Sequence, residues 1–183
     1  DLNGFDLTTD GTMTMNAGST LDVPGSKLTT NGNAIFNGGS ILDNDTLGSL
    51  YAMGSTTTFG AGLIGPTFDV LVHVKSATIR IANSTFNNNT AFYKTGTSND
   101  QSVGNNTFND EVSITTLSSG YLLMAATNND IFNSDATFSS LGNGIVYIAY
   151  RGTGTAFNGN VIVNSTGTGG VRIGASTGTS ELA

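Results

Sequence analysis

The chain has 183 residues, no cysteine and a formal net charge of −7, and only 10% of its residues are charged while 37% are hydrophobic. The acidic excess argues against nucleic acid and anionic membrane surfaces as partners, and the lack of cysteine excludes disulfides and thiolate chemistry. No apolar run reaches the roughly 18 residues that predict a membrane span, so no membrane insertion is expected.

The first part of the chain, residues 1–66, carries a glycine at every seventh position, namely Gly4, Gly11, Gly18, Gly25, Gly32 and Gly39. A glycine in every heptad costs about 1 kcal/mol in a helix interior, which excludes a coiled coil. The rhythm instead predicts short strands joined by glycine bends, with three units forming a coil of 21 residues. The fourth residue of each unit is predicted to point inward: Leu7, Thr14, Leu21, Leu28, Ile35 and Leu42.

The second part, residues 67–183, repeats on a phenylalanine followed by Asn or Asp. The anchors are Phe68-Asp69, Phe86-Asn87, Phe108-Asn109, Phe132-Asn133 and Phe157-Asn158, spaced 18, 22, 24 and 25 residues apart. Residues four and six positions after each Phe are predicted to face inward on one strand, because side chains alternate along a strand. A second strand follows, with inward pairs Ile79/Ile81, Leu122/Met124, Val146/Ile148 and Val171/Ile173.

Repeat periods of this length indicate a solenoid, whereas a propeller blade needs about 40 residues or more and four strands. The sequence therefore predicts an all-β fold, a right-handed single-stranded parallel β-helix with roughly eight coils of about 18–25 residues. Residues 1–183 are predicted to form one continuous β-solenoid segment and to be a fragment of a longer repeat protein.

Two columns of residues are predicted to stack along this solenoid. Asn87, Asn109, Asn133 and Asn158, with Asp69 one coil earlier, are expected to form a hydrogen-bonded ladder. The neighbouring phenylalanines, Phe68, Phe86, Phe108, Phe132 and Phe157, are expected to form a stacked core and not a ligand platform.

Few residues suggest chemistry. His73 is the only histidine and is predicted to point outward, and no nucleophile-elbow, zinc-protease, phosphate-loop or dinucleotide motif is present. No catalytic residue, no metal site and no enzyme are therefore predicted. Asp43 and Asp45 could hold calcium, but the calcium-loop signature is missing. A polysaccharide lyase or hydrolase would need Asp110, Glu111, Asp130 and Asp135 to converge on one face.

The outward positions of the second strand offer the best predicted contact surface, and surface glycans are its expected ligand. Its residues are Arg80, Leu123, Tyr147 and Arg172, with Tyr150 and Arg151 close in sequence. An ice-binding surface is a further alternative, but the Thr-x-Thr pairs, such as Thr12/Thr14 and Thr56/Thr58, are not expected to form a column.

Three runs, NNTFNDEVSITTLSSGYLLMA, NNDIFNSDATFSSLGNGIVYIA and GTAFNGNVIVNSTGTGGVRIG, carry a resemblance to a known family. They resemble the Phe-Asn repeats of very large secreted, adhesin-like cell-surface proteins of Bacteroidota, over residues 67–175. The resemblance implies export and a place in a stalk or surface fibre, and it supplies no catalytic residues. Residues 1–66 depart from the pattern, and Asp45-Thr46-Leu47 resembles the O-glycosylation acceptor of that phylum.

Together these features predict a structural or adhesive segment of an extracellular stalk or filament, without catalysis or cofactor. The expected partners are neighbouring repeats or copies of the chain stacked end to end. A carbohydrate-binding β-helix module is the main alternative, and a polysaccharide-degrading enzyme or an ice-binding solenoid is a less favoured one.

Overall fold

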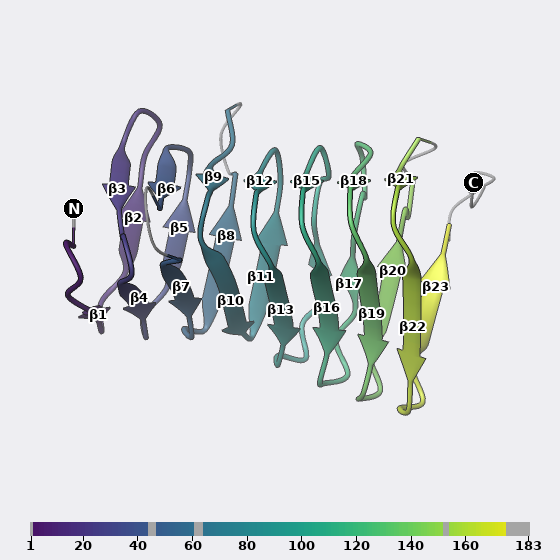
Figure 1. Ribbon diagram of the computed structural model, residues 1–183. Helices are drawn as coiled ribbons and strands as arrows, with labels where there is room; N and C mark the ends of the chain where they lie inside the picture. Colours follow the sequence, from purple (N-terminus) through teal and green to yellow (C-terminus); the bar gives the residue numbers. More distant parts are fainter. Residues whose placement is uncertain (1, 44–46, 61–63, 152–153, 175–183) are drawn as a thin grey trace.

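The protein is a right-handed parallel β-solenoid of about seven turns. The computed structural model describes residues 2–43, 47–60, 64–151 and 154–174, and within them there is no helix. The front strands run down and the rear strands run up while the chain advances from left to right, which makes the coil right-handed (Figure 1). The predicted fold class is confirmed.

Four parallel sheets form the walls of the described solenoid. The front sheet contains β1 (Leu7–Thr9), β4 (Lys27–Thr30), β7 (Ser49–Ala52), β10 (Leu71–Ser76), β13 (Thr90–Lys94), β16 (Val112–Thr116), β19 (Ala136–Ser140) and β22 (Val161–Ser165). The top sheet contains β3 (Thr20–Asp22), β6 (Ser40–Leu42), β9 (Thr67–Phe68), β12 (Thr85–Phe86), β15 (Thr107–Phe108), β18 (Ile131–Phe132) and β21 (Ala156–Phe157).

The rear wall is divided into two sheets. The first rear sheet contains β2 (Met13–Met15), β5 (Ala34–Phe36), β8 (Thr56–Phe59) and β11 (Thr78–Ile81). The second rear sheet contains β14 (Asp100–Gln101), β17 (Leu122–Leu123), β20 (Ile145–Ile148) and β23 (Gly170–Ile173).

The glycine rhythm sets the length of the first coil as predicted. Leu7 pairs with Leu28, 21 residues later, and β1, β2 and β3 occupy the three sides of that coil. The predicted inward column is only partly right: Leu28 is buried and Leu7 shares its column, but Thr14 is exposed between Met13 and Met15 on β2. On β5 it is Ala34 and Phe36 that are buried, so the intervening Ile35 faces outward. The glycines therefore fix the corners but not which residues of each side point inward.

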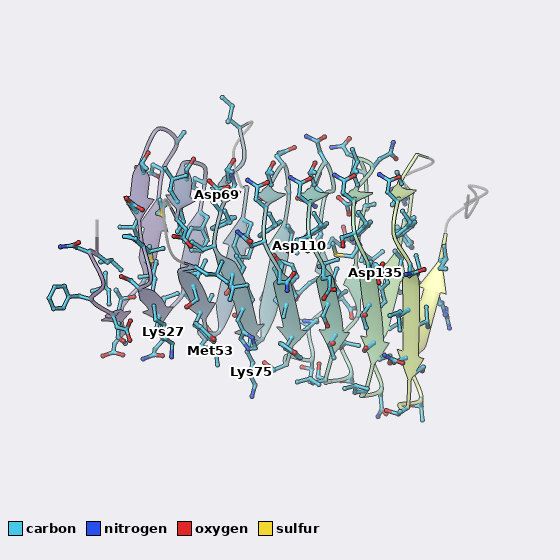
Figure 2. All side chains as sticks on the ribbon, in the orientation of Figure 1. Lys27, Met53, Asp69, Lys75, Asp110 and Asp135 are labelled. Carbon is cyan, nitrogen blue, oxygen red and sulfur yellow. The ribbon has the colours of Figure 1, made fainter. Side chains whose placement is uncertain are left out.

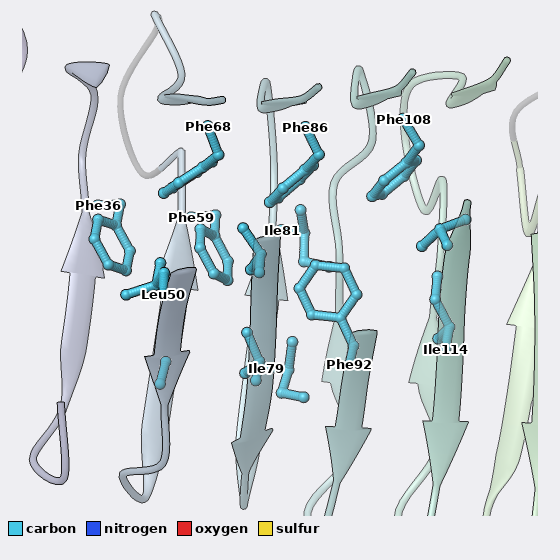
Figure 3. Close-up of a cluster of buried hydrophobic side chains, with 14 of the residues drawn as sticks. Phe36, Leu50, Phe59, Phe68, Ile79, Ile81, Phe86, Phe92, Phe108 and Ile114 are labelled. Carbon is cyan, nitrogen blue, oxygen red and sulfur yellow. The ribbon is translucent and has the colours of Figure 1, made fainter. Parts of the chain in front are cut away.

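Phenylalanines fill the middle of the solenoid as predicted (Figure 3). Phe68, Phe86, Phe108, Phe132 and Phe157 stack nearly parallel, with successive ring centroids 5.2, 5.1, 5.0 and 4.9 Å apart. Phe92 and Phe138 of the front sheet meet this stack edge-on. Parallel-displaced and edge-to-face contacts are the favoured arrangements of aromatic rings, so this column stabilises every coil that contributes to it.

The asparagine ladder is also confirmed. Asn109 donates to Asn87 Oδ1 at 2.6 Å, Asn133 to Asn109 at 2.7 Å and Asn158 to Asn133 at 2.8 Å. The ladder ends on the carboxylate of Asp69, which accepts from Asn87. Asn87, Asn109 and Asn133 each donate and accept, so the side chains repeat the backbone ladder on the outside of the corner.

Glycines stack on glycines at the corners of the coils. A Cβ on Gly120 would approach the carbonyl oxygen of Gly96 to 2.8 Å, and a Cβ on Gly144 would collide with the carbonyl oxygen of Gly120. Only a residue without a side chain lets the coils approach this closely.

The break in the rear wall is bridged by side chains. Asp100 Oδ2 accepts the backbone N–H of Ile79 at 2.9 Å, and Ser102 Oγ accepts that of Ile81 at 3.1 Å. Lys94 Nζ lies 2.6 Å from Asp100 Oδ2, and both side chains are almost fully buried. The sequence analysis did not find this ion pair, because Lys94 and Asp100 lie on different walls of the same coil.

Within the described residues, no helix is long and apolar enough to cross a membrane.

Candidate functional site

Aromatic and basic side chains gather on the second rear sheet. This group, called here the rear cluster, consists of Tyr121, Tyr147, Tyr150, Arg151 and Arg172. The ring of Tyr147 lies 5.8 Å from that of Tyr121 and 5.4 Å from that of Tyr150, both edge-to-face. The cluster forms because Tyr147 and Arg172 occupy the same register position on β20 and β23.

The arginines of the rear cluster lie against tyrosine rings. Arg172 lies 5.7 Å from the centroid of Tyr147 and donates to its hydroxyl at 3.4 Å, while Arg151 lies 5.7 Å from the ring of Tyr150. Both arginines are exposed, and the three tyrosines are partly exposed. Ring edges, hydroxyls and guanidinium donors together suit a polar ligand with hydroxyl or acidic groups.

Two residues of the predicted contact surface do not belong to the rear cluster. Arg80 lies on β11 of the first rear sheet, three coils before β20, because the rear wall changes sheet between β11 and β14. Leu123 occupies the expected register position beside Tyr147, but only 3% of its surface is exposed. The structure therefore brings together Tyr147, Tyr150, Arg151 and Arg172 and adds Tyr121.

A hollow lies on the outer surface of the front sheet and is called here the front groove. Its volume is about 390 Å³. Its lining includes Tyr51, His73, Ala91, Glu111, Ser113, Asp135, Thr137 and Ile162. The front strands place Tyr51, His73, Ala91, Ser113, Thr137 and Ile162 in one outward column. The groove exists because Ala91 and Ser113 are small, while the residues before and after them in the column are larger.

Stacked rings form one end of the front groove. His73 lies 5.3 Å from the ring of Tyr51 and 5.1 Å from that of Tyr93, and Lys27 lies 4.6 Å over the other side of Tyr51. Partial burial, with a smaller effect from the charge of Lys75, lowers the pKa of His73 below its usual value. His73 is therefore uncharged at neutral pH, and its predicted outward position is confirmed.

Carboxylates line one side of the front groove. Glu111 and Asp135 directly precede the paired residues Val112 and Ala136, so they stand on adjacent coils. Asp135 accepts from the backbone N–H of Asn160 at 2.8 Å and from its side chain at 3.1 Å, and these bonds lower its pKa. Asp110 lies beside them and accepts from the amide of Asn89, at 3.0 and 3.2 Å.

The carboxylates of the front sheet and Lys75 lie at opposite ends of the front strands. Figure 2 shows Asp110 and Asp135 toward the upper ends of these strands and Lys75 toward the lower end of β10, whereas Lys27 is the first residue of β4. Of the four carboxylates required for a polysaccharide-degrading site, Glu111 and Asp135 line the groove, and Asp110 directly precedes Glu111.

The fourth carboxylate, Asp130, lies in another corner, before β18, where it is fully buried. Asn106 donates to its Oδ1 from the backbone at 3.0 Å and from the side chain at 2.9 Å. Burial outweighs these bonds and raises the pKa of Asp130 to about 7.

The other candidate sites gain no ligand set. Asp43 Oδ2 accepts the backbone N–H of Gly48 at 2.6 Å, while Asn44, Asp45 and Thr46 lie outside the described residues, so neither the calcium loop nor the O-glycosylation motif is described. Among the residues that are described, no three His, Cys, Asp or Glu side chains are grouped to hold a metal ion.

The threonine pairs on the first rear sheet correct one expectation. Thr14 and Thr58 do share a column, because β2, β5 and β8 are in register, but Ile35 stands between them. The lengths of the coils, read from the sequence, would have predicted that Thr14 and Thr58 share a column. Because Ile35 separates them, the column is not a continuous array of threonines.

Sequence reasoning missed the front groove, although a signal for it exists. The groove column is the fifth residue after each repeat phenylalanine, giving His73, Ala91, Ser113, Thr137 and Ile162, and its acidic side is the third residue, giving Glu111 and Asp135. Aligning the outward positions on the phenylalanines would have shown both features.

Comparison with known proteins adds no relative: no family model, no curated protein and no solved structure matches this chain.

Proposed function

We propose that the chain is a structural segment of an extracellular β-solenoid stalk or fibre, with neighbouring coils as its partners and no catalysis. The observation that carries this proposal is the exposure of inward-facing residues at the two ends of the described solenoid. Val163 is 49% exposed, although Phe138, which occupies the same column one coil earlier, is fully buried. At the other end Leu7 is 39% exposed, and Leu28 beneath it is buried.

Stacked repeats bury their inward residues only where both neighbouring coils are present. An exposed valine and an exposed leucine in the core columns therefore match the surface that another coil of the same cross-section would cover. Unpaired front strands at such ends also offer backbone groups for continued pairing. A stiff rod that continues coil on coil suits a stalk that holds a binding region away from a cell.

The carboxylates of the front groove fit this proposal better than catalysis. Glycoside cleavage needs one carboxyl group that remains protonated and acts as an acid near neutral pH. The hydrogen bonds from Asn160 lower the pKa of Asp135, which keeps it ionised. The carboxyl group with a raised pKa, Asp130, is buried in another corner and does not line the groove.

Electron microscopy of the protein with its native flanking sequence tests the stalk. Seven turns at about 4.8 Å give a length of roughly 35 Å, so rods well beyond that length are expected. For the chain alone, Val163→Asp should reduce end-to-end association in sedimentation experiments. Ile162→Asp, which faces outward on the same strand, is the matched control. Short particles in electron microscopy, together with sedimentation that neither substitution changes, would overturn the proposal.

A carbohydrate-binding module is the second candidate, favoured by the contiguous tyrosines and arginines of the rear cluster. If it is right, Tyr147→Ala should abolish retention on a column of acidic polysaccharide, because it removes the ring that contacts Tyr121, Tyr150 and Arg172. Tyr93→Ala, on the front sheet, is the control and should leave retention unchanged.

A further inference from the structure

We propose that the front groove binds a linear glycan whose sugar units carry free ammonium groups. This inference does not depend on the stalk proposal, and it concerns a different wall of the solenoid from the rear cluster. It rests on the shape of the groove, on the side chains that form its surface and on the sign of its charge.

The shape of the groove suits an extended ligand. Its lining comes from six consecutive front strands, from Tyr51 on β7 to Ile162 on β22. Five coil spacings of about 4.8 Å make this a path of roughly 24 Å along the rod. A groove of about 390 Å³ stretched over that length is shallow and narrow, so it fits a chain lying along the axis better than a compact molecule.

The surface of the groove offers what a sugar ring needs. The imidazole of His73 lies between the rings of Tyr51 and Tyr93, and its exposed edge borders the hollow beside Ala91 and Ser113, which follow it in the outward column. The edge of an aromatic ring beside the methyl group of Ala91 can contact the apolar C–H groups of a pyranose. Ser113, Thr137 and Asn89 add hydroxyl and amide groups around it, which can exchange hydrogen bonds with sugar hydroxyls.

The charge of the groove calls for a cation. Glu111 and Asp135 line it one coil apart, and no lysine or arginine is part of its lining. Glu111 is exposed, and among the described residues its carboxylate has no hydrogen-bond or ion-pair partner. His73 adds no positive charge at neutral pH because its pKa is lowered. Carboxylates spaced by one coil can pair with ammonium groups spaced along a polymer.

A glycan explains these features better than a simple polyamine. A polyamine would satisfy the carboxylates but would leave the His73 ring and the hydroxyl groups of Ser113 and Thr137 without matching groups. A neutral glycan would use the ring and the hydroxyls but would leave Glu111 and Asp135 without a cation. Only a glycan with free amino groups pairs with the carboxylates and also contacts the His73 ring and the hydroxyl groups.

The test is isothermal titration calorimetry of the whole chain with two hexasaccharides of equal length. One is the glucosamine hexamer, which is cationic, and the other is the N-acetylglucosamine hexamer, which is neutral. We expect the cationic hexamer to bind about tenfold tighter or more, and its advantage to shrink at high salt. Equal binding of the two hexamers, or no binding of the cationic one, overturns the proposal.

Variants then locate the site. Ala91→Tyr continues the aromatic column of Tyr51 and His73 and fills the groove without changing the charge, so it should abolish binding. Thr8→Tyr, in the same outward column but outside the groove, is the matched control and should bind normally. Ser113→Tyr serves the same purpose as Ala91→Tyr should that variant fail to fold.

The charge is tested separately. Glu111→Gln should weaken binding of the glucosamine hexamer several-fold, whereas Asp10→Asn, an exposed carboxylate outside the groove, should have no effect although it changes the net charge equally. Spermine that binds as tightly as the hexamer overturns the glycan part of the proposal. Loss of binding in Tyr147→Ala with normal binding in Ala91→Tyr would assign the ligand to the rear cluster and overturn the front site.

Discussion

Lys94 and Asp100 show how one coil departs from its neighbours at the level of single residues. In the next coil their register positions hold Thr116 and Leu122, so the charged pair replaces a hydroxyl and an aliphatic side chain. Lys94 also donates to the carbonyl of Ala77 at 2.9 Å, and Asp100 accepts from the backbone of Ile79. The pair therefore satisfies backbone groups exactly where the rear wall lacks its own ladder.

A double-mutant cycle should measure the coupling of this pair. Lys94→Thr or Asp100→Leu alone leaves one charge buried without its partner and should lower the free energy of unfolding by about 3–5 kcal/mol. The double variant has the residues of the next coil at both positions and should recover most of that loss. It should remain about 1–3 kcal/mol less stable than the original protein, because the backbone N–H of Ile79 loses its acceptor, Asp100. Urea unfolding followed by circular dichroism gives the four values. Additive losses would show that the two charges are not coupled.

Asp130 makes the stability depend on pH. Its pKa is about 7 in the folded protein, above the ordinary aspartate value of 3.8. The folded state therefore holds this proton more tightly than the unfolded state does. The contribution of protonated Asp130 to the free energy of unfolding is fully present below about pH 4 and is lost as the pH rises to about 7. Three units of pKa correspond to roughly 4 kcal/mol.

The variant Asp130→Asn removes the titrating group while keeping its size. We expect it to be more stable than the original protein at pH 8 and about equal at pH 4, in thermal unfolding measured at both values. Asp135→Asn is the control, because the pKa of Asp135 is lowered and not raised. An Asp130→Asn variant that is destabilised at pH 8 would contradict a buried carboxyl group with a raised pKa.

At the scale of the elements, the corner glycines determine how closely one coil approaches the next. A Cβ on Gly32 would collide with the carbonyl oxygen of Gly11 in the coil before it, whereas a Cβ on Gly11 meets nothing within 4 Å. The two glycines occupy the same corner in successive coils, but only one has a described coil on the side toward which its Cβ would point.

Substituting each of these two glycines by alanine should thus give opposite results. Gly32→Ala forces the corner to open and should lower the free energy of unfolding by about 2 kcal/mol or more, within the range of severe single substitutions. Gly11→Ala should be neutral or slightly stabilising, since it restricts the unfolded chain without a clash. Urea unfolding of both variants checks this. Similar losses at both positions would mean that alanine acts through local backbone conformation and not through stacking.

Features that repeat at one position in every coil could be predicted from the sequence, and features that depend on contacts between different coils could not. The Phe and Asn ladders were predictable because each uses one residue at a constant place in every coil, so the chain itself carries the repeat. The front groove was missed because it is a gap in a column, where Ala91 and Ser113 carry no chemical signal alone. The break in the rear wall was missed because it depends on how Asp100 meets Ile79 in another coil.

At the scale of the whole molecule, each coil contacts mainly the coil before and the coil after it. The strands of the front sheet follow the order of the coils, and the pairing partners of β13 are only β10 and β16. In such a solenoid the stability is close to a sum over coils and their interfaces, and no single coil forms a unique centre. The number of coils can then change without changing the fold of the coils that remain.

Removal of one complete coil should therefore leave a folded, shorter rod. Deleting residues 90–111 takes out 22 residues, from Thr90 to the residue before its pairing partner Val112, and brings Val112 into register with Val72. Lys94 and Asp100 leave together, so no buried charge is stranded. Circular dichroism should still show β-structure, and small-angle X-ray scattering should show a rod about 4.8 Å shorter.

A deletion of half a coil is the control for this experiment. Removing residues 90–100 deletes the front strand β13 and takes Asp100 from β14 while leaving Gln101 and the following corner, so the rest of that coil has no front wall to close it. Phe86 and Phe108 would lose Phe92, which packs edge-on against both. We expect that variant to unfold or aggregate. If both deletions unfold the protein equally, stability depends on the whole chain folding as one unit, and the picture of interchangeable coils fails.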